Sequence, residues 1–142
     1  MSSPKYALAE YIVNNIATPT VSAVVPSLVY TDAAPQGTVD DHIVITHYGD
    51  DPNNTLGGMG GLFSGEFDID CKSSDPEVAA EMARDVKDEL DLLLNSSLNA
   101  DWVCGAVIIN NVSEGYEPPP GDGQDISIFM ATLEITMQYR SS

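Results

Sequence analysis

The sequence predicts a single α+β domain in which two helices pack on one face of a mostly antiparallel sheet. The chain has 142 residues, 43% of them apolar, which suits one domain with a substantial core. Two stretches show helical spacing of apolar residues, and the other apolar stretches predict strands, in the order α-β-β-β-α-β-β. No internal repeat or interdomain linker divides residues 1–142, so one domain is expected.

The first third of the chain predicts a helix and two strands. Residues 3–17 have apolar residues at helical spacing behind a serine that can cap a helix. Residues 21–30 are apolar but contain a proline, which predicts a short strand at a sheet edge. Residues 32–41 predict a turn. Residues 42–48 predict a strand with apolar side chains on both faces.

The rest of the chain predicts one strand, then a long helix, then two more strands. Residues 66–72 alternate between apolar and mostly acidic side chains, which predicts a half-buried strand with an acidic wet face. Asp75 is expected to cap the main helix, which should end near residues 95–99. Residues 102–112 and 126–140 predict the last two strands. The expected apolar stripe of the helix consists of Ala79, Met82, Ala83, Val86, Leu90, Leu93 and Leu94.

Two segments are predicted to be long loops. Residues 49–65 contain six glycines, and residues 113–125 contain three consecutive prolines. Both carry apolar side chains, which on surface loops often mark contacts with partners. The alternative, that these side chains fold back on their own domain, stays open. The predicted partner-interface residues are Leu56, Met59, Leu62, Phe63 and Tyr116.

Charge is the most unusual property of the composition. There are 22 acidic and 5 basic residues, for a net charge of −17. A nucleic-acid reader needs clustered Lys and Arg, so specific binding of DNA is not expected, whereas DNA could pass by such a surface. In about 1 M salt the Debye length falls to about 3 Å and self-repulsion is screened, which favours a halophilic protein. A moderately acidic protein of an ordinary cytoplasm remains the alternative.

The sequence indicates neither a membrane protein nor an exported one. The longest apolar run, residues 103–109, is far shorter than the roughly 18 residues of a membrane span. The first residues also lack the basic and apolar layout of a secretory signal, so folding in the cytoplasm is expected. Cys71 and Cys104 are expected to be buried free thiols, with a single disulfide as the alternative.

No pattern in the chain predicts catalysis or ligand binding. His42 and His47 lie five residues apart on a predicted strand, so they point to opposite faces and cannot share a metal. The glycines of residues 57–61 lack the Lys-Ser/Thr of a phosphate loop. Residues 51–62 begin like a calcium loop but lack its glycine and final glutamate. Catalytic, metal and cofactor sites are therefore not predicted, nor is an enzyme.

The order of these features resembles the tail-terminator (tail-completion) proteins of long-tailed phages and archaeal tailed viruses. The resemblance covers nearly the whole chain. In the first half of the chain its features are the N-terminal helix, which is followed by Leu28-Val29-Tyr30 and Ala34-Pro35, and the strand Ile43-Val44-Ile45, which is followed by a Gly-rich segment. The alternating strand then precedes the amphipathic helix of residues 75–94. Last come an apolar strand, Glu114, a Pro/Gly loop and the long final strand.

The resemblance implies a hexameric ring that caps the tail tube and joins the tail to the neck, with DNA passing through its lumen. The implied partners are further copies of the chain, the tail tube protein and a neck or connector protein. The implied location is the tail–neck junction of a virion assembled in the host cytoplasm. A neck or head-completion adaptor and a stand-alone acidic domain that binds a ligand or cation are the two alternatives.

Overall fold

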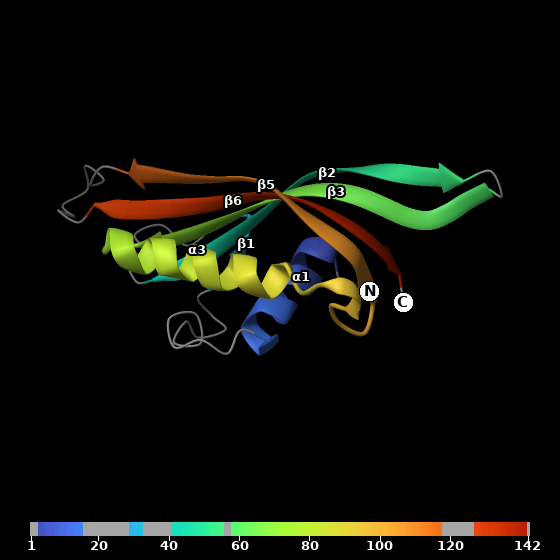
Figure 1. Cartoon of the computed structure of the whole chain (residues 1–142), viewed down its shortest axis with the longest axis horizontal. Helices are drawn as coiled ribbons and strands as arrows, with labels where there is room; N and C mark the ends of the chain where they lie inside the picture. The colour runs from blue at the N-terminus through green and yellow to red at the C-terminus, as the bar shows by residue number, and fades with distance from the viewer. Residues whose placement is uncertain (1–2, 16–28, 33–40, 56–57, 118–126, 142) are drawn as a thin grey trace.

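The structure is a computed structural model that describes residues 3–15, 29–32, 41–55, 58–117 and 127–141, without the side chains of residues 15 and 50–62. A six-stranded sheet has the order β1-β2-β3-β6-β5-β4, and the two described helices, α1 and α3, lie on one face of it (Figure 1). β1 and β2 are parallel, and all other neighbouring strands are antiparallel. The expected α+β class is confirmed.

The elements follow the predicted order with one added strand, β4. They are α1 (Pro4–Asn15), β1 (Val29–Thr31), β2 (His42–Thr55), β3 (Gly58–Ser73), α3 (Pro76–Leu90), β4 (Leu94–Ser97), β5 (Trp102–Glu117) and β6 (Ile128–Ser141). The expectations for residues 16–28 and 33–40 lie outside the described residues, and α1 is described as far as Asn15.

The core lies between the helices and the inner face of the sheet. Phe67, Ile69 and Cys71 of β3 are 0–1% exposed, which confirms the alternation predicted for this strand. β6 shows the same pattern, with every second side chain from Ala131 to Tyr139 buried. The two helices are joined where Tyr11 Oη donates a hydrogen bond to Glu89 Oε1 at 2.9 Å. Burial of one face of each strand therefore fixes the register of the sheet.

The main helix begins as predicted and ends earlier than predicted. The Asp75 carboxylate accepts a hydrogen bond from the Glu77 N–H at 2.9 Å, which caps α3. The last helical residue is Leu90, because the following residues turn and enter β4, where Ser96 pairs with Cys104 of β5. The extension to residues 95–99 is thus wrong. Leu94, expected in the apolar stripe, lies on β4 and is 69% exposed.

Residues 49–55 and 58–65 form a hairpin arm where a loop was predicted over residues 49–65, of which residues 56–57 lie outside the described residues. We call these residues of β2 and β3 the arm; it projects past the helices in Figure 1. Glycines suggested a loop, but extended backbone accepts glycine, and main-chain pairing of the two strands holds the hairpin. A register shift between His47 and Gly49 marks its start, where Gly49 has φ +156°, a value that side chains disfavour.

The second predicted loop is also partly strand. β5 continues to Glu117, so residues 113–117 pair with β6 and do not form a loop. The rest of that predicted loop, residues 118–125 with the three prolines, lies outside the described residues. Among the described residues, no helix has the length and apolar character needed to cross a membrane.

Candidate functional site

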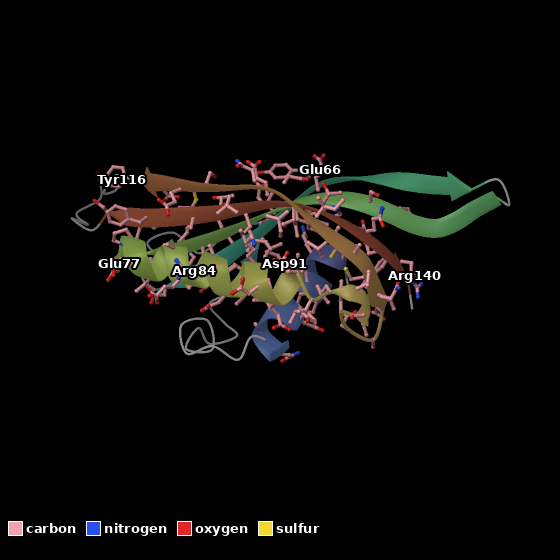
Figure 2. All side chains as sticks on the ribbon, viewed as in Figure 1. Glu66, Glu77, Arg84, Asp91, Tyr116 and Arg140 are labelled. Atoms are coloured by element: carbon pink, nitrogen blue, oxygen red, sulfur yellow. The ribbon has the colours of Figure 1, made fainter. Side chains whose placement is uncertain are left out.

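The predicted interface residues fall on two separate parts of the molecule. Met59, Leu62 and Phe63 belong to the arm strand of β3, and Leu56 lies outside the described residues. The Phe63 ring is partly buried and stacks on Tyr139, with ring centroids 5.8 Å apart. Tyr116 lies on β5, near the opposite end of the long axis (Figure 2). The structure therefore does not bring the predicted residues together within one chain.

Tyr116 belongs to a stretch of β5 that has a neighbour on only one side. β4 pairs with β5 between Val103 and Ala106, and no other described strand pairs with the rest of that side. We call the unpaired side of Val107–Glu117 the open edge. Three apolar side chains of this stretch are strongly exposed, namely Ile108 at 54%, Val112 at 48% and Tyr116 at 57%.

The sheet register shows which backbone groups the open edge presents. Ile45 O accepts a hydrogen bond from Asp32 N at 2.8 Å, so Ile45 directs its backbone groups away from β3. Ile45, Ile69, Leu133 and Val112 are successive partners across four antiparallel strands. In an antiparallel pair, two directly opposite residues direct their N–H and C=O groups either toward each other or away from each other. Ile45 and Ile69 point away from each other, so Ile69 and Leu133 point toward each other. Leu133 and Val112 then point away from each other. The N–H and C=O of Val112 therefore point outward, as do those of residues two and four positions further on.

A groove runs along the open edge between β5 and α3. Its two hollows have volumes of about 290 and 230 Å³. The floor is apolar and comes from β6. One wall comes from α3, and the other comes from residues of β5 between Val112 and Tyr116. The lining includes Ala79, Ala83, Val112, Tyr116, Phe129 and Leu133. An extended segment laid along the open edge would contact this apolar floor.

The groove also holds two of the five basic residues of the chain. Arg84 is exposed, and no ion pair involving it is found among the described residues. Lys87 pairs with Asp91 one helical turn further on, at 3.3 Å. Glu114 lines both hollows, so Arg84 is the exposed cation that an incoming carboxylate could meet in this groove.

The helix-free outer face of the sheet is acidic. Glu66, Asp68, Asp70 and Glu134 occupy neighbouring register positions on β3 and β6, and Figure 2 shows Glu66 on the side away from α3. Burial raises the pKa of Asp70, while a hydrogen bond that Thr132 Oγ1 donates at 2.7 Å opposes the rise. The Asp68 carboxylate accepts a bond from Tyr48 Oη at 3.0 Å, which raises the pKa of Tyr48.

The nucleophile and metal candidates are structural in the described residues. Cys71 and Cys104 are both buried free thiols, which confirms that expectation. Burial raises the pKa of Cys71, and that of Cys104 to about 11, so both remain thiols at neutral pH. His42 is buried, and His47 stacks on Phe67 with ring centroids 4.2 Å apart. No group of three or more His, Cys, Asp or Glu residues suited to a metal occurs in the described part of the chain.

No family model and no curated protein sequence matches this chain. A solved structure does match it from end to end. A chain from the virion of a native gene transfer agent (GTA) particle is 14% identical, with a TM-score of 0.57, over 98% of this chain and 99% of that one. The fold is shared with a virion protein. A second solved chain, 18% identical over 99% of this chain and 97% of its own, has a TM-score of 0.36, which does not indicate a shared fold.

Sequence reasoning missed the open edge and its groove. Residues 102–112 are so apolar that they predict a covered strand, and the basic residues of α3 predict only a solvated helix face. The only signal for the open edge in the sequence was weak, because Val112 and Tyr116 merely continue the apolar pattern of the strand toward the prolines. Nothing in the sequence indicates that β4 ends after four residues and leaves the rest of β5 unpaired.

Proposed function

We propose that this protein is a structural, non-enzymatic component of a tailed virion or a related particle, where it caps the tail tube as a hexameric ring and joins the tail to the neck. The observation that carries the proposal is the fold shared over 98% of this chain with a chain of the gene transfer agent virion. Because a fold by itself does not determine function, the proposal also depends on surfaces of this chain.

The acidic outer face supports a role beside moving DNA. In the proposed ring this face lines the lumen, so the carboxylates of Glu66, Asp68 and Glu134 face the DNA phosphates. Like charges repel, and DNA therefore passes without specific binding. The described cations do not gather on this face, where Lys72 is already paired with Glu117 at 2.9 Å.

The ring is tested by measuring the mass of the purified chain. Mass photometry at about 0.1 M and at molar KCl, the range over which the Debye length falls from about 10 to about 3 Å, should show six copies of the 15.1 kDa chain. Negative-stain images should show rings, and the chain should co-purify with particles. A chain that is monomeric at both salt concentrations and absent from particles would contradict the proposal.

The same shared fold also fits a neck or head-completion adaptor, because the matched chain comes from a whole virion. Particles produced without this gene distinguish the two roles. Loss of a cap that stops growth of the tube gives tails of irregular length. Loss of an adaptor gives tails of normal length that are not attached to heads. Images of the mutant particles decide between the two.

Leu56, Met59, Leu62, Phe63 and Tyr116 remain the proposed partner contacts. Removal of residues 55–62 takes away the end of the arm and leaves the helix-covered core unchanged. The variant should keep the circular dichroism spectrum of the wild type and fail to attach tails to heads. Normal infectious particles formed with this variant would remove the end of the arm from the interface.

A further inference from the structure

We propose that the arm of one copy adds as an extra strand to the open edge of β5 in a second copy, giving a head-to-tail assembly. The inference rests on the proposed function and deepens it, because it names the two surfaces that join neighbouring subunits of the ring. Its occupant is a second copy of this chain.

The open edge has the features of a strand that accepts another strand. Between Asn111 and Glu117 the pairing of β5 with β6 has no register shift, so this stretch of the ladder is regular. Val112, Glu114 and Tyr116 direct their backbone N–H and C=O groups outward, as the row of partners through Ile45 requires. An edge of this length without proline is a template for pairing with another chain.

The arm is positioned to supply that strand. β2 and β5 lie toward opposite edges of the sheet, and the arm and the Tyr116 end of β5 point in opposite directions along the molecule (Figures 1 and 2). β2, β3, β6 and β5 alternate in direction, so β2 of an adjoining copy, continuing the same sheet, runs antiparallel to β5. The pairing therefore has the same geometry as the pairs within the sheet.

The register also disfavours pairing of one arm with another. Pro52 is the partner of Phe63, which lies an even number of residues from Ile69, so its nitrogen faces the outer side of β2. Proline is tolerated there because the missing N–H is not needed for pairing with β3. Two arms that paired with each other would lack this donor on both strands, whereas an arm on the open edge lacks it on one strand only.

Charge favours the arm over a second open edge. The groove beside the open edge contains Arg84 and Lys87, and the sequence of the arm contains Asp50 and Asp51. Pairing of β5 with β5 of another copy, centred on Glu114, would instead place two carboxylates opposite each other, and like charges across strands are destabilising. The exposed cation of the groove, Arg84, can therefore meet a carboxylate of the arm of another copy.

Symmetry follows from the placement of the two surfaces. Since they lie on opposite edges of one sheet, two copies cannot use both pairs of surfaces at once. Each copy that receives an arm still has its own arm free for a third. A contact of this kind is heterologous and produces a ring when the rotation closes. The outer faces of all sheets then lie on the same side of the ring.

The first experiment blocks the open edge without breaking the sheet. Val112→Pro removes an N–H that points away from β6, so pairing within the chain is kept. The matched control Val112→Thr keeps the N–H and a β-branched side chain. We expect mass photometry to show rings for the wild type and the threonine variant, and monomers for the proline variant. Circular dichroism and thermal melting establish that all three are folded; if the proline variant is not, Arg84→Glu replaces it.

The second experiment tests the direction of the contact. In a shortened-arm variant, residues 52–63 are replaced by Asn-Gly, which closes a two-residue turn between Asp51 and Ser64, partners whose backbone groups face each other. This variant keeps the open edge, whereas Val112→Pro keeps the arm. Each alone should be monomeric, and a mixture should give a one-to-one dimer and nothing larger, because the single remaining contact joins arm to edge.

The outcomes separate this inference from the proposed function. If the wild type forms rings and either Val112→Pro or the shortened-arm variant still forms them, the inference is overturned, while the proposed ring stands. Dimers that are lost in Val112→Pro but persist in the shortened-arm variant indicate β5–β5 pairing and also overturn it. A wild type that forms no ring contradicts both. Restoration of assembly when Arg84→Glu is combined with Asp50→Lys and Asp51→Lys supports the proposed charge match.

Discussion

β3 and β5 are of equal length, yet they occupy opposite environments. Between Phe67 and Ser73, β3 has a neighbour on each side and α3 over its inner face. Between Val107 and Glu117, β5 has one described neighbour and little helix cover. The sequence suggests the reverse, because this part of β3 carries Asp68 and Asp70 whereas the first half of β5 is almost entirely apolar.

The difference shows that position in the sheet, more than the apolar content of a strand, decides what is buried. One covered face is enough for β3, whose apolar residues alternate with acids that face water. The apolar residues of β5 exceed what the helices cover, so Val112 and Tyr116 stay exposed in the single chain. Exposed apolar side chains along an unpaired edge indicate a surface that is covered in an assembly.

The largest expected difference between the two strands is in unfolding free energy. Phe67→Ala removes a side chain that is 1% exposed and should lower the free energy of unfolding by about 3–5 kcal/mol. Tyr116→Ala removes one that is 57% exposed and should change it by about 0.5 kcal/mol or less. Urea denaturation of the monomeric shortened-arm form measures both. Equal losses would contradict the contrast between the strands.

Salt should act mainly on the acidic face to which β3 contributes. With a net charge of −17, self-repulsion is large at about 0.1 M KCl and is screened near 1 M, so Tm should rise by several degrees or more across that range. Sucrose serves as the control, since it favours burial without screening charge. A flat Tm would contradict adaptation to high salt and would leave the proposed ring unaffected.

The cap of α3 tests how firmly the helix is held over β3. Asp75→Ala removes the acceptor of the Glu77 N–H and should lower the free energy of unfolding by about 1 kcal/mol. Asp75→Asn keeps an acceptor oxygen and should lose much less. Both are measured by thermal or urea unfolding. Identical losses in the two variants would mean that charge next to the helix dipole matters more than the hydrogen bond.

The smallest expected effect concerns the half-buried carboxyl of β3. Burial raises the pKa of Asp70 above its ordinary 3.8, so the folded state holds the proton more tightly than the unfolded state. Stability from this group is therefore present below pH 3.8 and is lost as pH rises through the folded pKa. Asp70→Asn should raise Tm slightly at pH 7 and leave it unchanged near pH 3.5. Glu134→Gln, exposed on the same face, is the control; an equal rise there would exclude burial as the cause.

The outcomes for particular residues show where sequence reasoning succeeded. The alternation around Phe67 and the cap at Asp75 were predictable, because each depends on a few neighbouring residues. The arm was not, because glycines in residues 57–61 suit a loop as well as extended backbone, and only pairing between β2 and β3 distinguishes them. Tyr116 stays a predicted contact residue, and its place in a hollow with Ala79 and Phe129 depends on how α3 crosses the sheet.

The sequence by itself determined the α+β class, the inward faces of β3 and β6, the start of α3 and the strong negative charge. These follow from local periodicity, capping and composition, which each segment carries with it. Only the tertiary structure decided that β4 is short, that β5 has an open edge and that the arm lies at the far side of the sheet. Strand order and pairing are set by contacts between segments distant in the chain, and the pattern of a single segment does not encode which neighbour it will have.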